Sequence, residues 1–390
     1  MKRIEGGICA VGGVRAAGAR RGKYGVALIA ASGTAAGVFT TNRIRAAPLD
    51  VTAENLSLSG GRLEGVIANS GSANAYTGAR GAEDARWMAG LFAETLGVGA
   101  DRIGVASTGV IGRYLDRRIL EELFDEARKR LRSEPEASGE AASAIMTTDT
   151  RVKEIAVEHR GFRVAGITKG AGMIEPNMAT MLAFLYTDAR ISPEALREAL
   201  LDAADESFNM LIVDGDTSTN DLVLVTATGK ADADPDDFRE ALTTVCVELA
   251  KMMAKDGEGA TKLVEMVVTG ALDGEDARLV AKTVMRSSLV KTALFGCDPN
   301  WGRIVAAAGR SGAEVDPEKI TLSISTAGGD EVFLVRDGKI VDGVLGAAEV
   351  VMRAEELLIT LHLGLGEGTG RAFGCDLSYD YVKINADYTT

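Results

Sequence analysis

Histidine, cysteine and aromatic residues are scarce in this sequence. Its 390 residues include two histidines, four cysteines and 5% aromatic residues. The cysteines are scattered and form no CxxC pair, so neither a zinc motif nor a disulfide framework is present in the pattern. We therefore expect reduced thiols and a cytoplasmic protein. The four cysteines are Cys9, Cys246, Cys297 and Cys375.

A net positive charge and long apolar runs are also lacking. The formal net charge of −13 excludes a general nucleic-acid or acidic-membrane surface, because both require a basic footprint. The longest early uncharged stretch, residues 24–42, contains Ser32 and Gly33 at its centre. This pattern predicts two short strands around a turn and not a spanning helix. We expect neither nucleic acid nor membrane as a partner.

Alternating strand-like and helical segments fill the chain, and its length predicts two or three packed units. Residues 117–133 form an amphipathic helical pattern, Ser192 and Pro193 open another helix, and a hairpin turns at Arg160 and Gly161. The pattern indicates an α/β or α+β protein of several layers. We expect domains at 1–190, 191–280 and 281–390, the last smaller and rich in strands.

The histidines offer little for catalysis. His159 lies beside the expected hairpin turn, which favours a solvated surface position, and His362 lies in an apolar run typical of a hydrogen-bonded core histidine. GxSxG, HExxH and P-loop motifs are absent from the sequence. The loop from Asp214 to Asp221 lacks the glycine and glutamate of an EF-hand, so we interpret it as a structural turn or a supporting element. We expect no metal site.

A nucleophile that needs no histidine remains. Thr180, in "MIEPNMATMLAF", stands where a loop becomes an apolar strand. One interpretation is that this β-branched residue merely begins the strand. The other is that the Ala179–Thr180 bond is cut by the Thr180 hydroxyl, after a turn at Pro176 and Asn177. The new α-amine, with a pKa of roughly 7.7 to 8.0, would then serve as the base.

Long segments of the chain resemble the ornithine acetyltransferase family (glutamate N-acetyltransferase, arginine biosynthesis). In order, they are "GVFTTNRIRAAP", "NSGSANAYTG", "STGVIG", "IMTTDT", "KGAGMIEPNMATMLAFLYTDA", "FNMLIVDGDTSTND", "DGEGATK", "DPNWGRI" and "DLSYDYVKINADYTT". The resemblance implies a layered, self-processing fold of the N-terminal-nucleophile type. It also implies cleavage into an α chain of residues 1–179 and a β chain of residues 180–390, and an assembly of two α and two β chains.

The resemblance also assigns roles to residues. Thr180 matches the nucleophile, and Thr108 with Gly109 matches the pair that forms the oxyanion hole. In "TTDT", Thr147 matches a ligand-binding position, and Thr148 is the candidate instead if the register differs by one. Without the resemblance, each of these residues reads as an ordinary cap, turn or loop residue. The substrate-binding positions are Thr147, Lys169, Thr180, Glu258, Asn385 and Thr390.

The implied reaction transfers acetyl from N2-acetyl-L-ornithine to L-glutamate through an acetyl-threonine ester. Both substrates are small molecules, and no metal or organic cofactor is implied. Family members differ in accepting acetyl-CoA as a donor substrate, and the sequence leaves this open. Two other hypotheses stay open, a threonine-nucleophile amidohydrolase or aminopeptidase of related fold, and a non-catalytic binding protein that is never cleaved.

Overall fold

The structure is a computed structural model that describes residues 1–175 and 181–387. The chain divides into two compact units. The first contains residues 1–209 and 216–249, and the second contains residues 210–215 and 250–387. This division differs from the expected boundaries at 190 and 280. Strand β10 (Leu222–Asp232) hydrogen-bonds to strands from the first part of the chain, so residues beyond 190 belong to the first unit.

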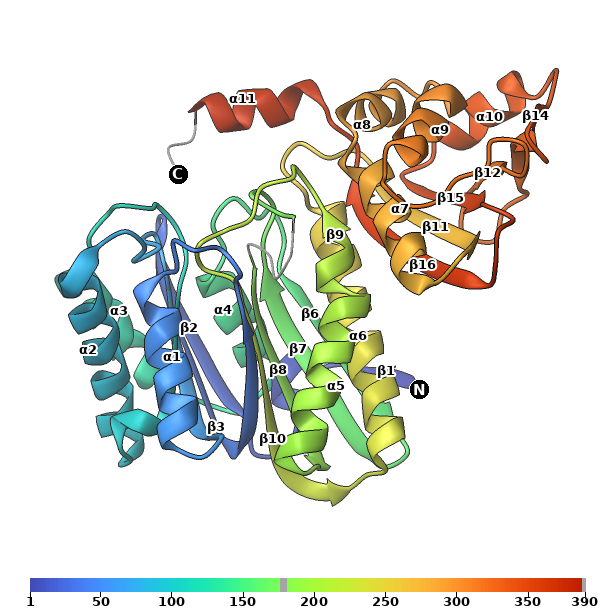
Figure 1. Ribbon diagram of the computed structural model, residues 1–390. Coiled ribbons are helices and arrows are strands. Elements are labelled where there is room, and N and C mark those ends of the chain that lie inside the picture. The colour runs from blue at the N-terminus through green and yellow to red at the C-terminus, as the bar shows by residue number, and fades with distance from the viewer. Residues whose placement is uncertain (176–180, 388–390) are drawn as a thin grey trace. The chain divides into compact units, whose positions relative to one another are not determined.

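The first unit alternates strands and helices along the chain (Figure 1). Its other strands are β1 (Lys2–Ile4), β2 (Arg15–Arg21), β3 (Tyr24–Phe39), β4 (Arg62–Ser70), β5 (Ile103–Ser107), β6 (Lys153–His159), β7 (Phe162–Lys169) and β8 (Leu182–Arg190). Its helices are α1 (Ala47–Leu58), α2 (Gly78–Leu96), α3 (Arg117–Arg128), α4 (Pro135–Ala144), α5 (Pro193–Glu206) and α6 (Pro235–Lys255), which continues into the second unit.

Strand β3 joins two halves of one sheet, whose order is β1-β6-β7-β8-β10-β3-β4-β5 with β2 also paired to β3. Residues 24–30 of β3 pair with β2, and residues 34–39 pair with β10. The expected turn in residues 24–42 is wrong, because β3 runs through it with a register shift against β4 between Ala30 and Gly33. A Cβ on Gly33 would lie 2.2 Å from the Ala227 carbonyl oxygen. The glycine therefore marks a close backbone approach, not a turn.

Successive residues of β3 face two different cores, as strand geometry requires. Ala27 and Ile29 belong to a cluster that also contains Phe184 and Leu224 from the other half of the sheet. Val26, Leu28 and Ala30 belong to a second cluster with helices α2 and α3. The two half-sheets thus share one core, which also contains Ala137 and Ala141 of α4, and helices α2 and α3 cover the other face of β3. The predicted layered α/β class is confirmed.

Local sequence signals place several elements correctly. Ser192 caps α5, because its side chain accepts a hydrogen bond from the Ala195 N–H at 3.2 Å. The predicted amphipathic helix is α3, which buries one apolar face. The predicted hairpin joins β6 to β7, and both turn residues, Arg160 and Gly161, have positive φ. Such φ values match the twist of a tight hairpin.

The second unit contains a seven-stranded sheet of order β14-β13-β12-β15-β11-β16-β9. Its strands are β9 (Leu211–Ile212), β11 (Leu263–Ala271), β12 (Thr321–Ser325), β13 (Val332–Arg336), β14 (Lys339–Ile340), β15 (Glu356–His362) and β16 (Gly368–Cys375). Its helices are α7 (Gly274–Arg286), α8 (Ser288–Phe295), α9 (Trp301–Gly309), α10 (Leu345–Met352) and α11 (Tyr379–Asp387).

His362 is not the core histidine that its apolar run suggested. It is exposed at the end of β15, while its neighbours Leu361 and Leu363 are fully buried. Alternation along the strand turns the histidine outward. Its Nδ1 lies 3.0 Å from the Thr269 hydroxyl, so the expected hydrogen bond is present at a solvent-facing position.

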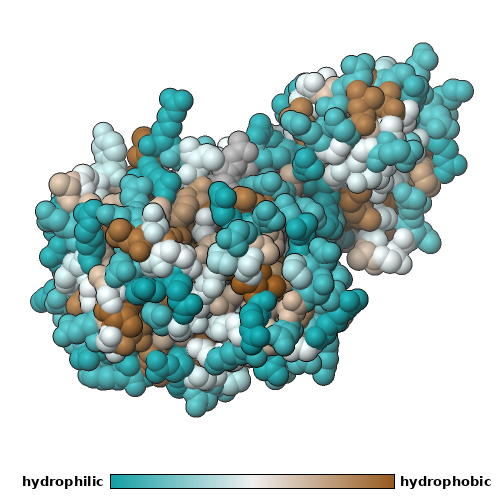
Figure 2. Space-filling model, turned by 60° about the horizontal axis from the view of Figure 1, so that its bottom comes forward, coloured by the Kyte–Doolittle hydropathy of each residue, from teal (hydrophilic) through white to brown (hydrophobic). Residues whose placement is uncertain are grey.

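The visible surface is mainly hydrophilic. Figure 2 shows hydrophobic side chains on this face as small patches separated by hydrophilic ones. Among the described residues, no helix has the length and apolar character needed to cross a membrane.

Candidate active site

Lys169, the last residue of β7, is the centre of a buried polar cluster in the first unit. Only 4% of its surface is exposed. Its Nζ donates a hydrogen bond to the Thr147 hydroxyl at 2.9 Å and another to the Thr108 hydroxyl at 3.2 Å. Thr108 follows β5, and Thr147 follows α4. Three of the predicted site residues therefore meet, although they lie far apart in the sequence.

The contact also bears on the register of the "TTDT" motif. Thr147, and not Thr148, is the residue whose hydroxyl accepts from Lys169. The geometry therefore favours the first of the two threonines as the candidate ligand-binding position.

Gly109 occupies a position that only glycine fits. Its φ is +129°, and a Cβ there would lie 2.5 Å from the carbonyl carbon of Gly71 and 2.7 Å from the Ser72 nitrogen. The "NSGSANA" and "STGVIG" loops interlock at this point, where the parallel strands β4 and β5 end. A backbone held this closely is suited to presenting donors in a fixed direction.

Hydrogen bonds beneath the two loops fix the backbone next to Gly109. The Thr108 N–H donates to the Asn69 carbonyl at 2.9 Å, and the Ser107 hydroxyl donates to the Asn69 side chain at 2.6 Å. The Asn220 amide donates to the carbonyls of Ala73 and Ser107. These two bonds confirm the interpretation of the polar loop that ends at Asp221 as a supporting element.

Asp149 is a buried carboxylate that the sequence analysis missed. It accepts hydrogen bonds at 2.6 Å from both the Lys153 ammonium and the Gly170 N–H, and at 3.0 Å from the Thr147 N–H. Burial alone would raise the pKa of Asp149, but the charges of Lys169 and Lys153 outweigh it and hold that pKa well below its usual range. The ionised carboxylate thus holds the backbone at Thr147 and at Gly170, the residue that follows Lys169.

Asp221 is a second buried carboxyl group that was missed. It is 1% exposed, and its Oδ1 accepts from the Met181 N–H at 2.9 Å. Burial raises the pKa of Asp221 well above its usual range, and the Met181 N–H, the Thr40 hydroxyl and Lys169 oppose this only in part. Met181 directly follows Thr180 in the sequence. The only available sequence signal was the position of Asp221 at the end of a polar loop, immediately before a buried strand.

Five residues with a predicted role fall outside the described part of the chain. They are Pro176 and Asn177 of the expected turn, Ala179 and Thr180 on the two sides of the expected cleavage point, and Thr390. The described chain stops at Glu175 and resumes at Met181.

Glu258 and Asn385 come together within the second unit. The Asn385 amide donates to the Glu258 carboxylate at 2.8 Å. Helix α11, which carries Asn385, starts beside Gly259, where a Cβ would lie 2.5 Å from the Tyr381 nitrogen. The glycine permits this close approach and brings the tail to the "DGEGATK" loop.

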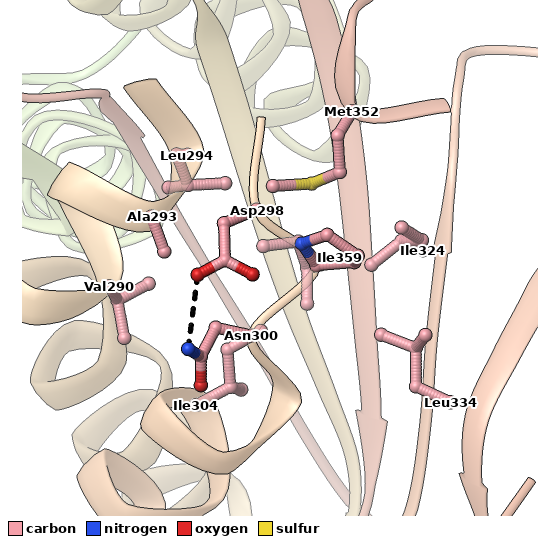
Figure 3. Close-up of a pocket in the computed structure, with 11 residues that line it drawn as sticks. Val290, Ala293, Leu294, Asp298, Asn300, Ile304, Ile324, Leu334, Met352 and Ile359 are labelled. Carbon is pink, nitrogen blue, oxygen red and sulfur yellow. Dashed lines mark hydrogen bonds between the residues drawn. The ribbon is translucent and has the colours of Figure 1, made fainter. Parts of the chain in front are cut away.

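The second unit contains an apolar hollow. Figure 3 shows its lining, which comes from helices α8, α9 and α10 and from the sheet. The two polar side chains in it, Asp298 and Asn300, are hydrogen-bonded to each other at 3.1 Å. None of the predicted site residues lines this hollow.

Comparisons with known proteins identify the family. The ArgJ family model matches residues 11–390. The chain belongs to the ArgJ family. A glutamate N-acetyltransferase of Methanosarcina mazei is 56% identical over 397 residues, covering 100% of both chains. The arginine biosynthesis bifunctional protein ArgJ of Archaeoglobus fulgidus is 52% identical over 380 residues, covering 97% of this chain and 99% of its own.

A solved structure of an ArgJ relative agrees with this family assignment. The crystal structure of the arginine biosynthesis bifunctional protein ArgJ from Bacillus halodurans is 44% identical, with a TM-score of 0.50. The match covers 54% of this chain and 100% of that chain. The predicted resemblance to this group of acetyltransferases is confirmed.

Proposed function

We propose that this ArgJ-family chain transfers an acetyl group from N2-acetyl-L-ornithine to L-glutamate through an acetyl ester of Thr180. One observation carries the proposal most directly. The buried Lys169 ammonium contacts both Thr108 and Thr147, so residues given separate roles by the resemblance share one cluster. The names of the relatives, glutamate N-acetyltransferase and bifunctional ArgJ, support the same reaction.

The proposed chemistry begins with self-cleavage. The Thr180 hydroxyl attacks the Ala179 carbonyl carbon, the peptide bond becomes an ester, and water releases residues 1–179 and the free Thr180 amine. In each turnover that amine takes the hydroxyl proton while the Thr180 oxygen attacks the acetyl carbonyl. Ornithine leaves with the proton, and the amine of glutamate then takes the acetyl group. The Thr108 hydroxyl and the Gly109 N–H stabilise the oxyanion.

Substrate binding follows from charge. The Lys169 ammonium would pair with the substrate α-carboxylate, and Thr147 would hold the same end of the molecule by hydrogen bonds. Glu258 would receive the side-chain ammonium of ornithine, with Asn385 holding that carboxylate in place and Thr390 completing the site. The reaction needs no metal or organic cofactor, because the Thr180 amine serves as base.

We also propose an assembly of two α and two β chains in the cytoplasm. Light scattering on the purified protein, together with denaturing electrophoresis, measures the mass of the assembly and of its chains. A monomeric mass would contradict this part of the proposal.

The activity is tested by acetyl transfer measured against acetate release. Purified protein is incubated with N2-acetyl-L-ornithine, with and without L-glutamate, and the products are separated by chromatography. Formation of N-acetylglutamate with ping-pong kinetics is the expected result. Acetate release that does not depend on glutamate would indicate an amidohydrolase instead. A parallel reaction with acetyl-CoA and glutamate measures whether this donor is accepted.

Replacement of the oxyanion hydroxyl should slow the chemical step. For Thr108→Ala we expect kcat to fall on the order of 100-fold with a smaller change in KM, because one donor to the developing charge is lost. Thr95→Ala is the matched control, since the Thr95 hydroxyl lies on α2 and bonds only to the Leu91 carbonyl within its own helix. An unchanged kcat in Thr108→Ala would remove this residue from the role.

Asp221 should act on the self-cleavage step, because it holds the N–H of the residue that follows Thr180. We expect Asp221→Ala to slow cleavage about 10-fold, the value of one lost buried hydrogen bond. Asp221→Asn keeps an acceptor oxygen and should stay near the wild-type rate. Precursor made by cell-free synthesis is followed by electrophoresis over time. Equal slowing in both variants would show that the carboxyl proton, and not the acceptor, is required.

A further inference from the structure

His159, at the end of β6, is a buried histidine. Only 8% of the residue is exposed, which corrects the expected solvated position. The ring packs edge-on against Phe162 with centroids 5.8 Å apart, so the hairpin itself covers it. No hydrogen-bond partner for the buried Nε2 atom is present in the described part of the chain, and the nearby Glu240 carboxylate oxygen is 3.6 Å away. An unsatisfied buried nitrogen is costly, which makes an additional ligand favourable.

Two carboxylates from α6 face this nitrogen. Asp237 and Glu240 are three residues apart near the start of the helix, so they lie on one face. The potential ligand atoms of His159, Asp237 and Glu240 all lie within 4.8 Å of one another. Contact between Phe162 and Phe238, with centroids 6.5 Å apart, anchors the helix start to the hairpin. The three groups therefore belong to a fixed frame.

The charge balance favours a cation. Arg160, which is mostly exposed, donates from Nη1 to Asp237 Oδ2 at 2.9 Å, and the same nitrogen lies 2.8 Å from Oδ1. Apart from the imidazole, the two carboxylates and this arginine sum to one negative charge. The helix start opposes a cation with only about half a positive charge. A divalent ion can take an Asp237 oxygen while the Arg160 side chain turns into solvent.

We propose that His159, Asp237 and Glu240 bind one divalent transition-metal ion of the zinc class. One imidazole nitrogen and two carboxylate oxygens suit Zn²⁺ better than Mg²⁺ or Ca²⁺, which prefer oxygen ligands alone. Solvent at the Glu240 side supplies the remaining ligands, since the side chain of Glu240 is 63% exposed. No metal motif marks this site in the sequence, because its ligands come from a hairpin and a helix. His159 and Asp237 are 78 residues apart along the chain.

The site is structural and separate from the proposed chemistry. His159 pairs with Phe162 at one end of the β6–β7 ladder, and Lys153 pairs with Thr168, the neighbour of Lys169, at the other end. The ion would tie the hairpin turn to the start of α6. Its binding therefore does not depend on acyl transfer at Thr180.

Calorimetric titration of the chelator-treated full-length protein with zinc chloride tests the site. We expect one Zn²⁺ per chain, and binding weakened about 10-fold or more in both His159→Gln and Glu240→Gln, since each loses one ligand. His362→Gln is the matched control, because His362 is the other histidine of the chain. Zinc should raise the melting temperature of the wild type and of His362→Gln, and not that of His159→Gln.

The outcomes separate this inference from the proposed function. Thr180→Ala should bind zinc as the wild type does, whatever its activity. Glu240→Gln changes an exposed side chain, so it remains informative if His159→Gln fails to fold. Zinc binding that is absent in the wild type, or unchanged in both ligand variants, overturns the site. Equal stabilisation by magnesium chloride would overturn the assignment to the zinc class.

Discussion

Thr180→Ala should abolish both self-cleavage and acetyl transfer while leaving the fold intact. Alanine supplies no hydroxyl to attack the Ala179 carbonyl, and without cleavage no α-amine is released to act as base. Denaturing electrophoresis should show one full-length chain, where the wild type gives two fragments. N-terminal sequencing of the wild-type C-terminal fragment should begin at Thr180.

Thr180→Ser is the conservative control for this experiment. Serine keeps a hydroxyl next to the future amine, so we expect slower but measurable cleavage and turnover. Rapid mixing of wild-type protein with N2-acetyl-L-ornithine alone should add one acetyl group to the fragment that begins at Thr180. Normal cleavage of Thr180→Ala, or activity in an uncleaved chain, would place the nucleophile elsewhere.

Asp149→Ala should destabilise the first unit more than most single substitutions do. Lys153 is 1% exposed, and its ammonium donates to Asp149 at 2.6 Å. Loss of the carboxylate would remove this close ion-pair partner from a buried charge, at a cost of about 3–5 kcal/mol of unfolding free energy. Denaturant unfolding, with tryptophan fluorescence as the signal, measures the change.

The two tryptophans allow each unit to be followed by itself. Trp87 lies on α2 in the first unit, and Trp301 begins α9 in the second. In a Trp301→Phe background the fluorescence therefore reports the first unit. The double variant Asp149→Ala with Lys153→Met should recover most of the lost stability, because it removes the buried charge as well. Equal instability of the single and double variants would show that the backbone contacts of Asp149 matter more than the ion pair.

The same carboxylate makes stability depend on pH. The pKa of Asp149 is lower in the folded chain than in the unfolded one. Its stabilisation is therefore present above the unfolded value of about 3.9 and is lost as pH falls toward the folded pKa. Asp221 has the opposite sign, because its folded pKa is raised, and its cost grows as pH rises above about 3.9. Unfolding of Asp149→Asn and Asp221→Asn across acidic and neutral pH separates the two contributions.

The predictions that needed only neighbouring residues were the reliable ones. Ser192 with Pro193 predicted the start of α5, and Arg160 with Gly161 predicted the β6–β7 turn. Capping and turn formation involve residues a few positions apart, so the sequence contains the whole interaction. The stretch around Gly33 failed because the deciding contact, the Ala227 carbonyl, comes from a strand almost two hundred residues further on.

The candidate site shows the same difference between local and long-range contacts. The sequence by itself determined the family, through several long motifs, and it predicted Thr108, Thr147 and Lys169 as site residues. Only the tertiary structure showed that Lys169 contacts both threonines, that Asp149 accepts from the Thr147 N–H and that Asp221 accepts from the Met181 N–H. It also decided that His159 is buried beside two carboxylates. Burial, pKa and partners depend on which strands and helices pack together, and that packing joins residues whose separation in the chain carries no local signal.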